Sequence, residues 1–182
     1  SFGIYNDIPE LLSVSLGSAE TTLVQLTNAY CTFVNGGKKV VPIFIDRIQD
    51  RRGKTIFNAD KRKCLGCEEI SYLKDEIPLI QDNRKQIISP ETAYQITSMM
   101  EGVVKRGTGR KLRNLKLSLA GKTGTTNKNM DAWFIGSTSK LVVGVYVGFD
   151  EPKTLGRYET GAKAALPVFK KFVEKVVKKK DA

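Results

Sequence analysis

The amino-acid sequence predicts an α+β fold in which an antiparallel sheet packs against helices. Apolar residues recur at helical spacing over 21–35 and again over 161–180. Between them, a β-compatible run that starts at residue 117 is followed by two apolar runs, over 131–138 and 140–149. Connections this short join antiparallel neighbours, so the three strands should form a meander. The last helix, apolar on one face and rich in lysine on the other, should cover the sheet.

Length and composition favour a single globular domain. The chain has 182 residues, of which 41% are hydrophobic and 27% are charged. The longest apolar runs, such as 141–147, are far shorter than a bilayer span, and the first residues lack the order of a signal peptide. We therefore expect a chain that by itself neither spans nor targets a membrane.

The net charge and the residue types present limit the possible partners and catalytic mechanisms. The net charge of +11 allows nucleic acid, anionic lipid headgroups or an anionic polymer as partner, and does not choose among them. The sequence contains no histidine, which removes Ser-His-Asp and Cys-His catalysis and nearly all zinc chemistry. A lysine or a carboxylate would have to carry the proton in any acyl transfer. We expect neither a metal nor another cofactor.

The helix over 21–35 has Ser18 as a candidate N-cap, and Gly36 and Gly37 should end it. Its apolar face includes Cys31, which we expect in the core.

A hairpin and an irregular segment should follow this helix. The run over 39–49 is β-branched and apolar, residues 50–53 form a turn, and 54–57 can return as a second strand. The segment over 58–85 is charged and weakly periodic, which is typical of a surface insertion. Its C-x-x-C pair, Cys64 and Cys67, favours a local disulfide or inert thiols over a metal site, because no second pair accompanies it.

A second helix should begin where Ser89 caps a first-turn Pro90, and end at Gly107. Its apolar face, methionines included, should be core: Ala93, Ile96, Met99, Met100, Val103 and Val104.

Two basic features have more than one interpretation. The cations after the second helix are either a polyanion patch or a solvated loop: Lys105, Arg106, Arg110, Lys111, Arg113 and Lys116. The lysine-rich face of the helix over 161–180 leaves a membrane-surface role open beside the favoured role of covering the sheet.

The stretch over 117–127 has the most specific chemistry. An apolar β-compatible run leads into Lys122, Thr123, Gly124 and Thr125. A peptide that ends in a carboxylate can lie antiparallel to an exposed edge strand, where a lysine supplies charge and threonine hydroxyls donate hydrogen bonds. Gly124 has no side chain to block that approach.

A phosphate-binding loop is excluded as the explanation for Lys122 and Thr123. That motif needs a glycine five residues before Gly121, where Lys116 stands, and no helix signature follows Thr123.

The extended pattern resembles the class A, bifunctional penicillin-binding proteins. It consists of the Ala-Gly-Lys-Thr-Gly-Thr-Thr-Asn string over 120–127 and the Asp-Ala-Trp-Phe string over 131–134. The strings over 16–23 and 29–37 and the Gly-Thr-Gly over 107–109 are similar to the same family. The resemblance covers nearly the whole chain apart from 58–85.

This resemblance implies a part of a serine D,D-transpeptidase that cross-links peptidoglycan stem peptides and is acylated by β-lactams. It implies Thr125 and Lys122 as catalytic residues, with the Thr125 backbone N–H donating to the reacting carbonyl oxygen. It also implies recognition of the stem-peptide carboxylate by Lys122, Thr123 and Thr125. Gly124 would position the cleft edge, and Thr126 and Asn127 complete the implied set. The site would lie on the periplasmic face of the bacterial inner membrane.

The serine nucleophile of that family precedes the Lys-Thr-Gly motif by a long interval and begins a core helix, and no S-x-x-K serine of this sequence fits that position. Two S-x-x-K strings begin at Ser71 and Ser137, but the first lies in the irregular segment and the second bridges two strands. No S-x-N or Y-x-N string occurs. We therefore expect 1–182 to be the C-terminal portion of a transpeptidase domain, inactive alone. The nucleophile, glycosyltransferase domain and membrane anchor would lie upstream, and the uncovered apolar surface should favour self-association.

Two other functions are weighed against this one. A basic nucleic-acid-binding domain is supported only by charge, without a recognition motif or an aromatic stacking set, so we expect no nucleic acid. A serine β-lactamase-like hydrolase shares the Lys-Thr-Gly chemistry, but the longer string over 120–127 favours the transpeptidase.

Overall fold

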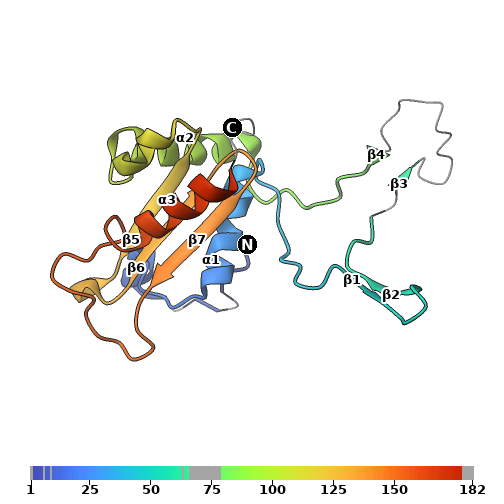
Figure 1. The fold of residues 1–182 in the computed structure, drawn as a ribbon, viewed down its shortest axis with the longest axis horizontal. Coiled ribbons are helices and arrows are strands. Elements are labelled where there is room, and N and C mark those ends of the chain that lie inside the picture. The colour runs from blue at the N-terminus through green and yellow to red at the C-terminus, as the bar shows by residue number, and fades with distance from the viewer. Residues whose placement is uncertain (1, 6, 9, 63, 66–78, 178–182) are drawn as a thin grey trace. The chain divides into compact units, whose positions relative to one another are not determined.

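The computed structural model describes residues 2–5, 7–8, 10–62, 64–65 and 79–177, which form two units (Figure 1). The larger unit comprises Ser1–Val40 and Gln86–Ala182, and the smaller one is Val41–Lys85. The smaller unit therefore begins before the irregular segment that was expected to start at residue 58.

A three-stranded antiparallel sheet forms the centre of the larger unit (Figure 1). Its strands are β5 (Ala120–Thr125), β6 (Ala132–Ser137) and β7 (Val142–Val147), in that order. Each strand pairs with the next along the chain, as the short connections require, so the predicted meander and α+β class are confirmed. Among the described residues β5 has a strand on one side only, which makes it an edge strand.

Helices cover both faces of this sheet. The face that includes Gly144 lies against α1 (Leu23–Val34), since an added Cβ there would meet Thr27. The face that includes Gly136 lies against α3 (Ala165–Val176), whose Phe169 ring is close to it. Because Gly144 pairs with Ile135, the neighbour of Gly136, these two faces are opposite. The third long helix, α2 (Pro90–Arg106), packs against β5.

The core lies mainly between α3 and the sheet. The Phe134 and Phe169 rings are fully buried, with centroids 4.9 Å apart. The 3-10 helix η2 (Arg110–Leu115) adds the buried Leu112. Burial of α3 confirms that the last helix covers the sheet, although it begins at Ala165 and not at the expected residue 161.

The helix ends confirm one prediction and correct another. Ser89 caps α2 through its side chain, which accepts from Thr92 N–H, and Pro90 is the first helical residue, as predicted. The expected Ser18 cap of α1 is wrong. Thr22 caps that helix in a capping box with Gln25, and the chain before it forms the short 3-10 helix η1 (Leu12–Leu16).

Four side chains expected in the core are more exposed than predicted, and of these Ile96 and Val103 are half-buried. Met99 is 70% exposed on α2, whereas Met100 is buried beside the sheet. The two are adjacent in sequence and so lie about 100° apart around the helix, and only one can face the sheet. Cys31 is half-buried and has a free thiol. Burial raises the pKa of that thiol.

The smaller unit has little regular structure. Strands β1 (Arg47–Gln49) and β2 (Thr55–Asn58) form the predicted hairpin, but the strand expected over 39–49 extends over its last residues only. Strands β3 (Cys64–Leu65) and β4 (Leu79–Ile80) form a second pair. Cys67, and with it the C-x-x-C prediction, lies outside the described residues.

The chain leaves and re-enters the larger unit at one place. Lys38 and Gln86 form an isolated antiparallel bridge. The Gln86 side-chain Nε2 donates to Gly36 O at 2.6 Å, and Ile87 N donates to Gly37 O at 2.9 Å. These bonds join the two stretches of the larger unit that flank Val41–Lys85 in the sequence.

Candidate functional site

The residues from Lys122 to Thr125 form the C-terminal part of edge strand β5. Lys122 and Thr125 are exposed, and Thr123 and Gly124 are half-buried. The strand ends where the sequence changes to Thr126-Asn127, which enters the short 3-10 helix η3 (Asn127–Asn129). The cation, the hydroxyls and the glycine thus lie along the margin of a sheet.

Hydrogen bonding fixes the direction of the β5 backbone groups. Thr126 N donates to Asp131 O at 3.1 Å, which continues the β5–β6 register in which Thr125 pairs with Ala132. Antiparallel pairs alternate between hydrogen-bonded and non-hydrogen-bonded, so Gly124 points its N–H and C=O toward β6. Thr123 and Thr125 therefore direct their backbone N–H and C=O groups to the open side of the sheet.

Lys122 lines an apolar pocket. This pocket has a volume of about 350 Å³, and besides Lys122 its lining is apolar or aromatic: Tyr30, Phe33, Ile96, Met99, Met100 and Val103. The Lys122 ammonium donates to Thr123 O at 2.5 Å, on the open side of the strand. The lysine therefore brings a positive charge to the strand margin from the face covered by α1 and α2.

The threonine side chains of β5 lie on the other face. Thr123 and Thr125 pair with Phe134 and Ala132, which are buried in the core beneath α3. Thr123 Oγ1 lies 3.0 Å from Thr108 Oγ1, and either hydroxyl can donate. Thr125 Oγ1 accepts from Gly161 N at 3.1 Å. Sequence reasoning singled out Thr108 only within the Gly-Thr-Gly string and missed Gly161.

The turn after β5 is closed by side chains. Thr126 Oγ1 accepts from Asp131 N at 2.8 Å, while Asn127 is exposed. Asn129 adopts a left-handed conformation with φ of 53°, which asparagine tolerates better than most residues. Its Nδ2 donates to Gly156 O at 3.1 Å and to Arg157 O at 2.9 Å. The turn is thereby bound to the segment that precedes α3.

An aromatic pair extends across the strands next to this turn. The Trp133 and Tyr146 rings have centroids 4.8 Å apart, and Tyr146 Oη donates to Asp131 Oδ1 at 2.9 Å. This hydrogen bond to a carboxylate raises the pKa of Tyr146, since ionising the phenol would remove the donated proton.

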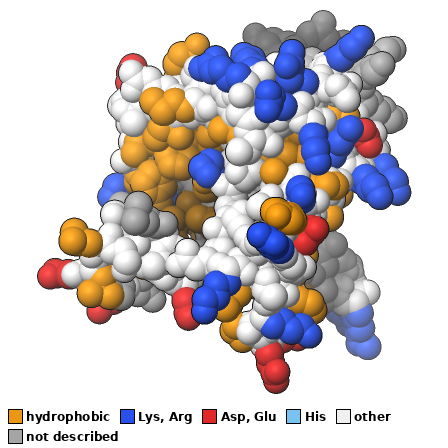
Figure 2. Space-filling model, turned by 90° about the vertical axis from the view of Figure 1, so that its left-hand side faces the viewer, with side chains coloured by type: hydrophobic (Ala, Val, Ile, Leu, Met, Phe, Trp, Pro, Cys, Tyr) orange, Lys and Arg blue, Asp and Glu red, His pale blue; other side chains and the backbone are white. Residues whose placement is uncertain are grey.

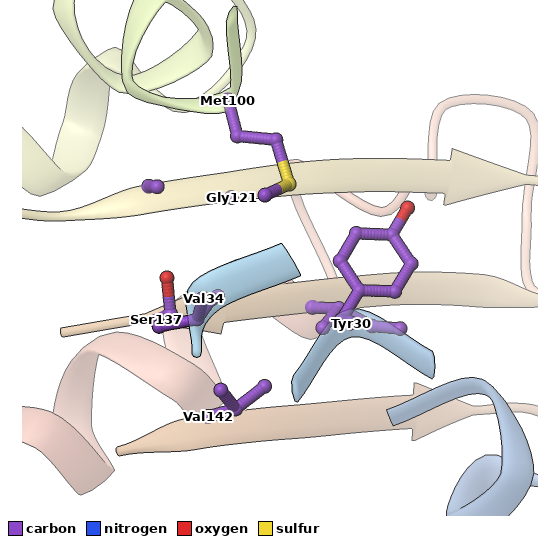
Figure 3. A pocket seen from close by; sticks show the side chains of 9 residues that line it. Tyr30, Val34, Met100, Gly121, Ser137 and Val142 are labelled. Atoms are coloured by element: carbon purple, nitrogen blue, oxygen red, sulfur yellow. The ribbon is translucent and has the colours of Figure 1, made fainter. Parts of the chain in front are cut away.

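Ser137, the described S-x-x-K serine, is poorly placed for nucleophilic attack. It ends β6, is 5% exposed, and lines a second pocket together with Tyr30, Val34 and Met100 (Figure 3). Lys140 lies beyond it in an exposed turn between strands, whereas the family's serine and lysine are one helical turn apart. Ser71 is outside the described residues.

The part of the chain that the structure describes contains no group of three or more Cys, Asp or Glu residues that would hold a metal ion. None of its helices combines the length and the hydropathy needed to cross a bilayer.

Lys and Arg side chains are spread widely over the face shown in Figure 2, with hydrophobic side chains gathered around a hollow.

A protein-family comparison matches residues 9–174 to the penicillin binding protein transpeptidase domain. Penicillin-binding protein 1A of Rickettsia typhi is 45% identical over 181 residues, which are 97% of this chain and 23% of that protein. The Pseudomonas aeruginosa protein of the same name is 35% identical over 210 residues, covering 98% of this chain and 26% of its own length. The chain thus spans about a quarter of these relatives.

Solved structures agree with the sequence comparisons. Penicillin-binding protein 1A from Haemophilus influenzae matches with a TM-score of 0.78 and 33% identity, over 98% of this chain and 30% of that one. PonA1 from Mycobacterium tuberculosis in complex with penicillin V has a TM-score of 0.62 and 25% identity, over 87% of this chain and 39% of that one. These similarities support neither a nucleic-acid-binding domain nor a β-lactamase-like hydrolase.

Proposed function

Since this chain belongs to the penicillin-binding protein transpeptidase family, we propose that it contributes the substrate-binding strand of a peptidoglycan D,D-transpeptidase. The observation that carries the proposal is the open edge of β5, to which Thr123 and Thr125 direct their backbone N–H and C=O groups. A stem peptide ending in D-Ala-D-Ala would lie antiparallel to this edge and pair with those groups.

The side chains beside the edge suit the free carboxylate of such a peptide. Lys122 supplies a positive charge, and the Thr123 and Thr125 hydroxyls each have a proton to donate. Gly124 leaves the backbone between the two threonines accessible. Thr126 and Asn127 complete the set of residues that we propose to bind the substrate. The carboxylate of a penicillin would occupy the same place, and the similar protein PonA1 has been solved in complex with penicillin V.

The backbone N–H of Thr125 is the proposed donor to the reacting carbonyl oxygen. It points to the open side of β5, where the carbonyl carbon of the penultimate D-alanine would lie. A donor aimed at the negative charge that develops on that oxygen contributes about 3 kcal/mol to the transition state in other acyl-transfer enzymes.

The reaction also requires a serine and a base that we place outside this chain. The serine Oγ attacks the penultimate carbonyl carbon, and its proton passes to a lysine amine and then to the departing D-alanine nitrogen as the C–N bond breaks. An amine of a second stem peptide then attacks the acyl-enzyme carbonyl carbon, the ester C–O bond to the serine breaks, and the proton lost by the amine passes to the serine oxygen. The burial of Ser137 supports this assignment.

We place the segment that bears the nucleophile over the apolar pocket beside Lys122. The pocket's lining from α1 and α2 includes Met99, which is 70% exposed. In the parent protein, which we propose is a bifunctional enzyme on the periplasmic face of the inner membrane, this surface would be covered. In the chain alone it would be free to bind a second copy.

A fluorescent penicillin tests the proposal. We expect covalent label on a longer chain, extended upstream through an S-x-x-K serine, and none on residues 1–182 alone. Replacing Lys122 with Ala in the longer chain should slow labelling at least about tenfold, because a charged partner of the carboxylate is lost. Label on residues 1–182 at Ser137 or Ser71 would contradict the proposal, as would an unlabelled longer chain.

A further inference from the structure

Two loops that are far apart in the sequence reach the hydroxyls of β5. Thr108 is 15 residues before Thr123, and its hydroxyl lies 3.0 Å from the Thr123 hydroxyl. Gly161 is 36 residues after Thr125, and its backbone N–H donates to the Thr125 hydroxyl at 3.1 Å. Both threonine hydroxyls proposed to bind the carboxylate therefore have a partner inside the protein.

The contact with Gly161 depends on the absence of a side chain. A Cβ at this position would lie 2.3 Å from Trp133 O and 2.5 Å from Gly124 O, where backbone atoms cannot give way. The backbone of Gly161 thus lies directly against the paired residues Gly124 and Trp133. Any larger residue would have to lift the loop and lengthen the bond to Thr125.

The Gly161 loop is held from both sides. Before it, the Asn129 side chain binds the carbonyl oxygens of Gly156 and Arg157. After it, Gly161 O accepts from the N–H of the fully buried Leu166 at 2.9 Å. The N–H that Gly161 presents to Thr125 is therefore fixed in place by the core and by the turn after β5.

These contacts determine which hydroxyl protons are available. A hydroxyl has one donor and two acceptor positions, so Thr125 Oγ1 keeps its proton free when it accepts from Gly161. A carboxylate only accepts, so with a carboxylate bound the Thr123 hydroxyl must donate outward. Thr108 can then supply the proton in the bond between the two hydroxyls.

We propose that Thr108 and Gly161 are positioning residues that direct the Thr123 and Thr125 hydroxyl protons toward the carboxylate of the incoming peptide or β-lactam. The proposal rests on the function proposed above and assigns carboxylate selectivity to two loops outside the Lys-Thr-Gly strand. The loss of either contact should weaken recognition of the acid and should matter little for a ligand without a negative charge.

The test compares acylation by a penicillin with acylation by its carboxyl methyl ester, in the longer penicillin-reactive protein. Thr108→Val keeps the shape of an exposed side chain and removes the hydroxyl, and Thr108→Ser restores the hydroxyl. We expect Thr108→Val and Gly161→Ala to lower the second-order acylation rate for the acid about tenfold. For the ester we expect a change within about twofold, and Thr108→Ser should react with the acid at nearly the wild-type rate.

The outcomes separate this proposal from the proposed function. Wild-type protein that does not react with penicillin would overturn both. Reactive wild-type protein whose Thr108→Val variant loses equal rate toward acid and ester would overturn the positioning role alone, because a general distortion affects both ligands. An unchanged Thr108→Val variant, or a Thr108→Ser variant no better than Thr108→Val, would do the same.

Discussion

At the residue scale, the bond between Tyr146 and Asp131 predicts a measurable titration. The Asp131 carboxylate accepts from the phenol at 2.9 Å, so the pKa of Tyr146 should lie above its usual value of about 10. A raised folded-state pKa stabilises the protein below the unfolded pKa, and this contribution is lost as pH rises through the folded-state value. Carbon-13 labelling of the tyrosine rings would follow the titration by NMR.

The matched variant for this titration is Asp131→Asn. It removes the negative charge and should bring the pKa of Tyr146 down toward the value of an exposed tyrosine. A Tyr146 midpoint that is the same in both proteins would show that the hydrogen bond does not persist in solution.

The Lys122–Thr125 string and Gly161 show which part of the site could be predicted from the sequence and which could not. The Lys122–Thr125 string was found because its chemistry lies in consecutive residues of one strand. Gly161 was missed because its role comes from a close approach to Gly124, 37 residues earlier in the sequence and brought near by the fold. A glycine that is needed for contact across a fold leaves no local signal in a single sequence.

At the element scale, two glycines should respond to alanine in opposite directions. An added Cβ at Gly136, in β6, would lie 2.5 Å from Phe169 Cζ in a fully buried ring, so Gly136→Ala should destabilise by about 1–3 kcal/mol. At Gly102, within α2, the nearest atom is the end of the Arg106 side chain at 3.3 Å, which can move away. Gly102→Ala should therefore stabilise by about 0.5–1 kcal/mol.

Urea denaturation of the two alanine variants beside the wild type would measure both effects. Equal stability of the Gly136→Ala protein would mean that α3 can shift away from the sheet, contrary to the close packing of Phe134 and Phe169. A destabilised Gly102→Ala protein would mean that the helix needs glycine there for a contact other than Arg106.

The elements were predicted best where local chemistry decides them. Ser89 and Pro90 gave the start of α2, because a capping hydroxyl and a fixed φ act within one turn. Ser18 failed as the α1 cap because Thr22 has Gln25 three residues later and forms the reciprocal box. The expected strand over 39–49 was too long, since Pro42 lacks the N–H that a ladder requires.

At the scale of the whole molecule, the smaller unit should be removable. Residues 41–85 leave and re-enter beside the Lys38–Gln86 bridge, so a Gly-Ser loop of about four residues can connect the two ends. We expect the shortened chain to keep its fold and to melt within about 4 °C of the full chain, as followed by circular dichroism. A decrease of more than about 10 °C would show that the larger unit depends on residues 41–85.

Exposed apolar side chains on α2 predict self-association of the isolated chain. Tyr94 is 74% exposed and Met99 is 70% exposed. We expect size-exclusion chromatography with light scattering to find dimers whose fraction grows with concentration and falls when Met99 is replaced with Lys. Tyr158→Lys, at a 62% exposed position between two cations, is the control and should leave the dimers intact. A monomer at all concentrations would contradict the prediction.

The margin of β5 that faces away from β6 can also promote aggregation. Backbone N–H and C=O groups at an edge strand can pair with any extended chain, not only with the substrate peptide. Pairing with the same strand of a misfolded copy would extend the sheet into an aggregate. Lys122, whose charge suits an acidic ligand, would repel its own counterpart in such a stack. The Lys122 ammonium group would thus both favour a ligand that carries a carboxylate and oppose the pairing of identical strands.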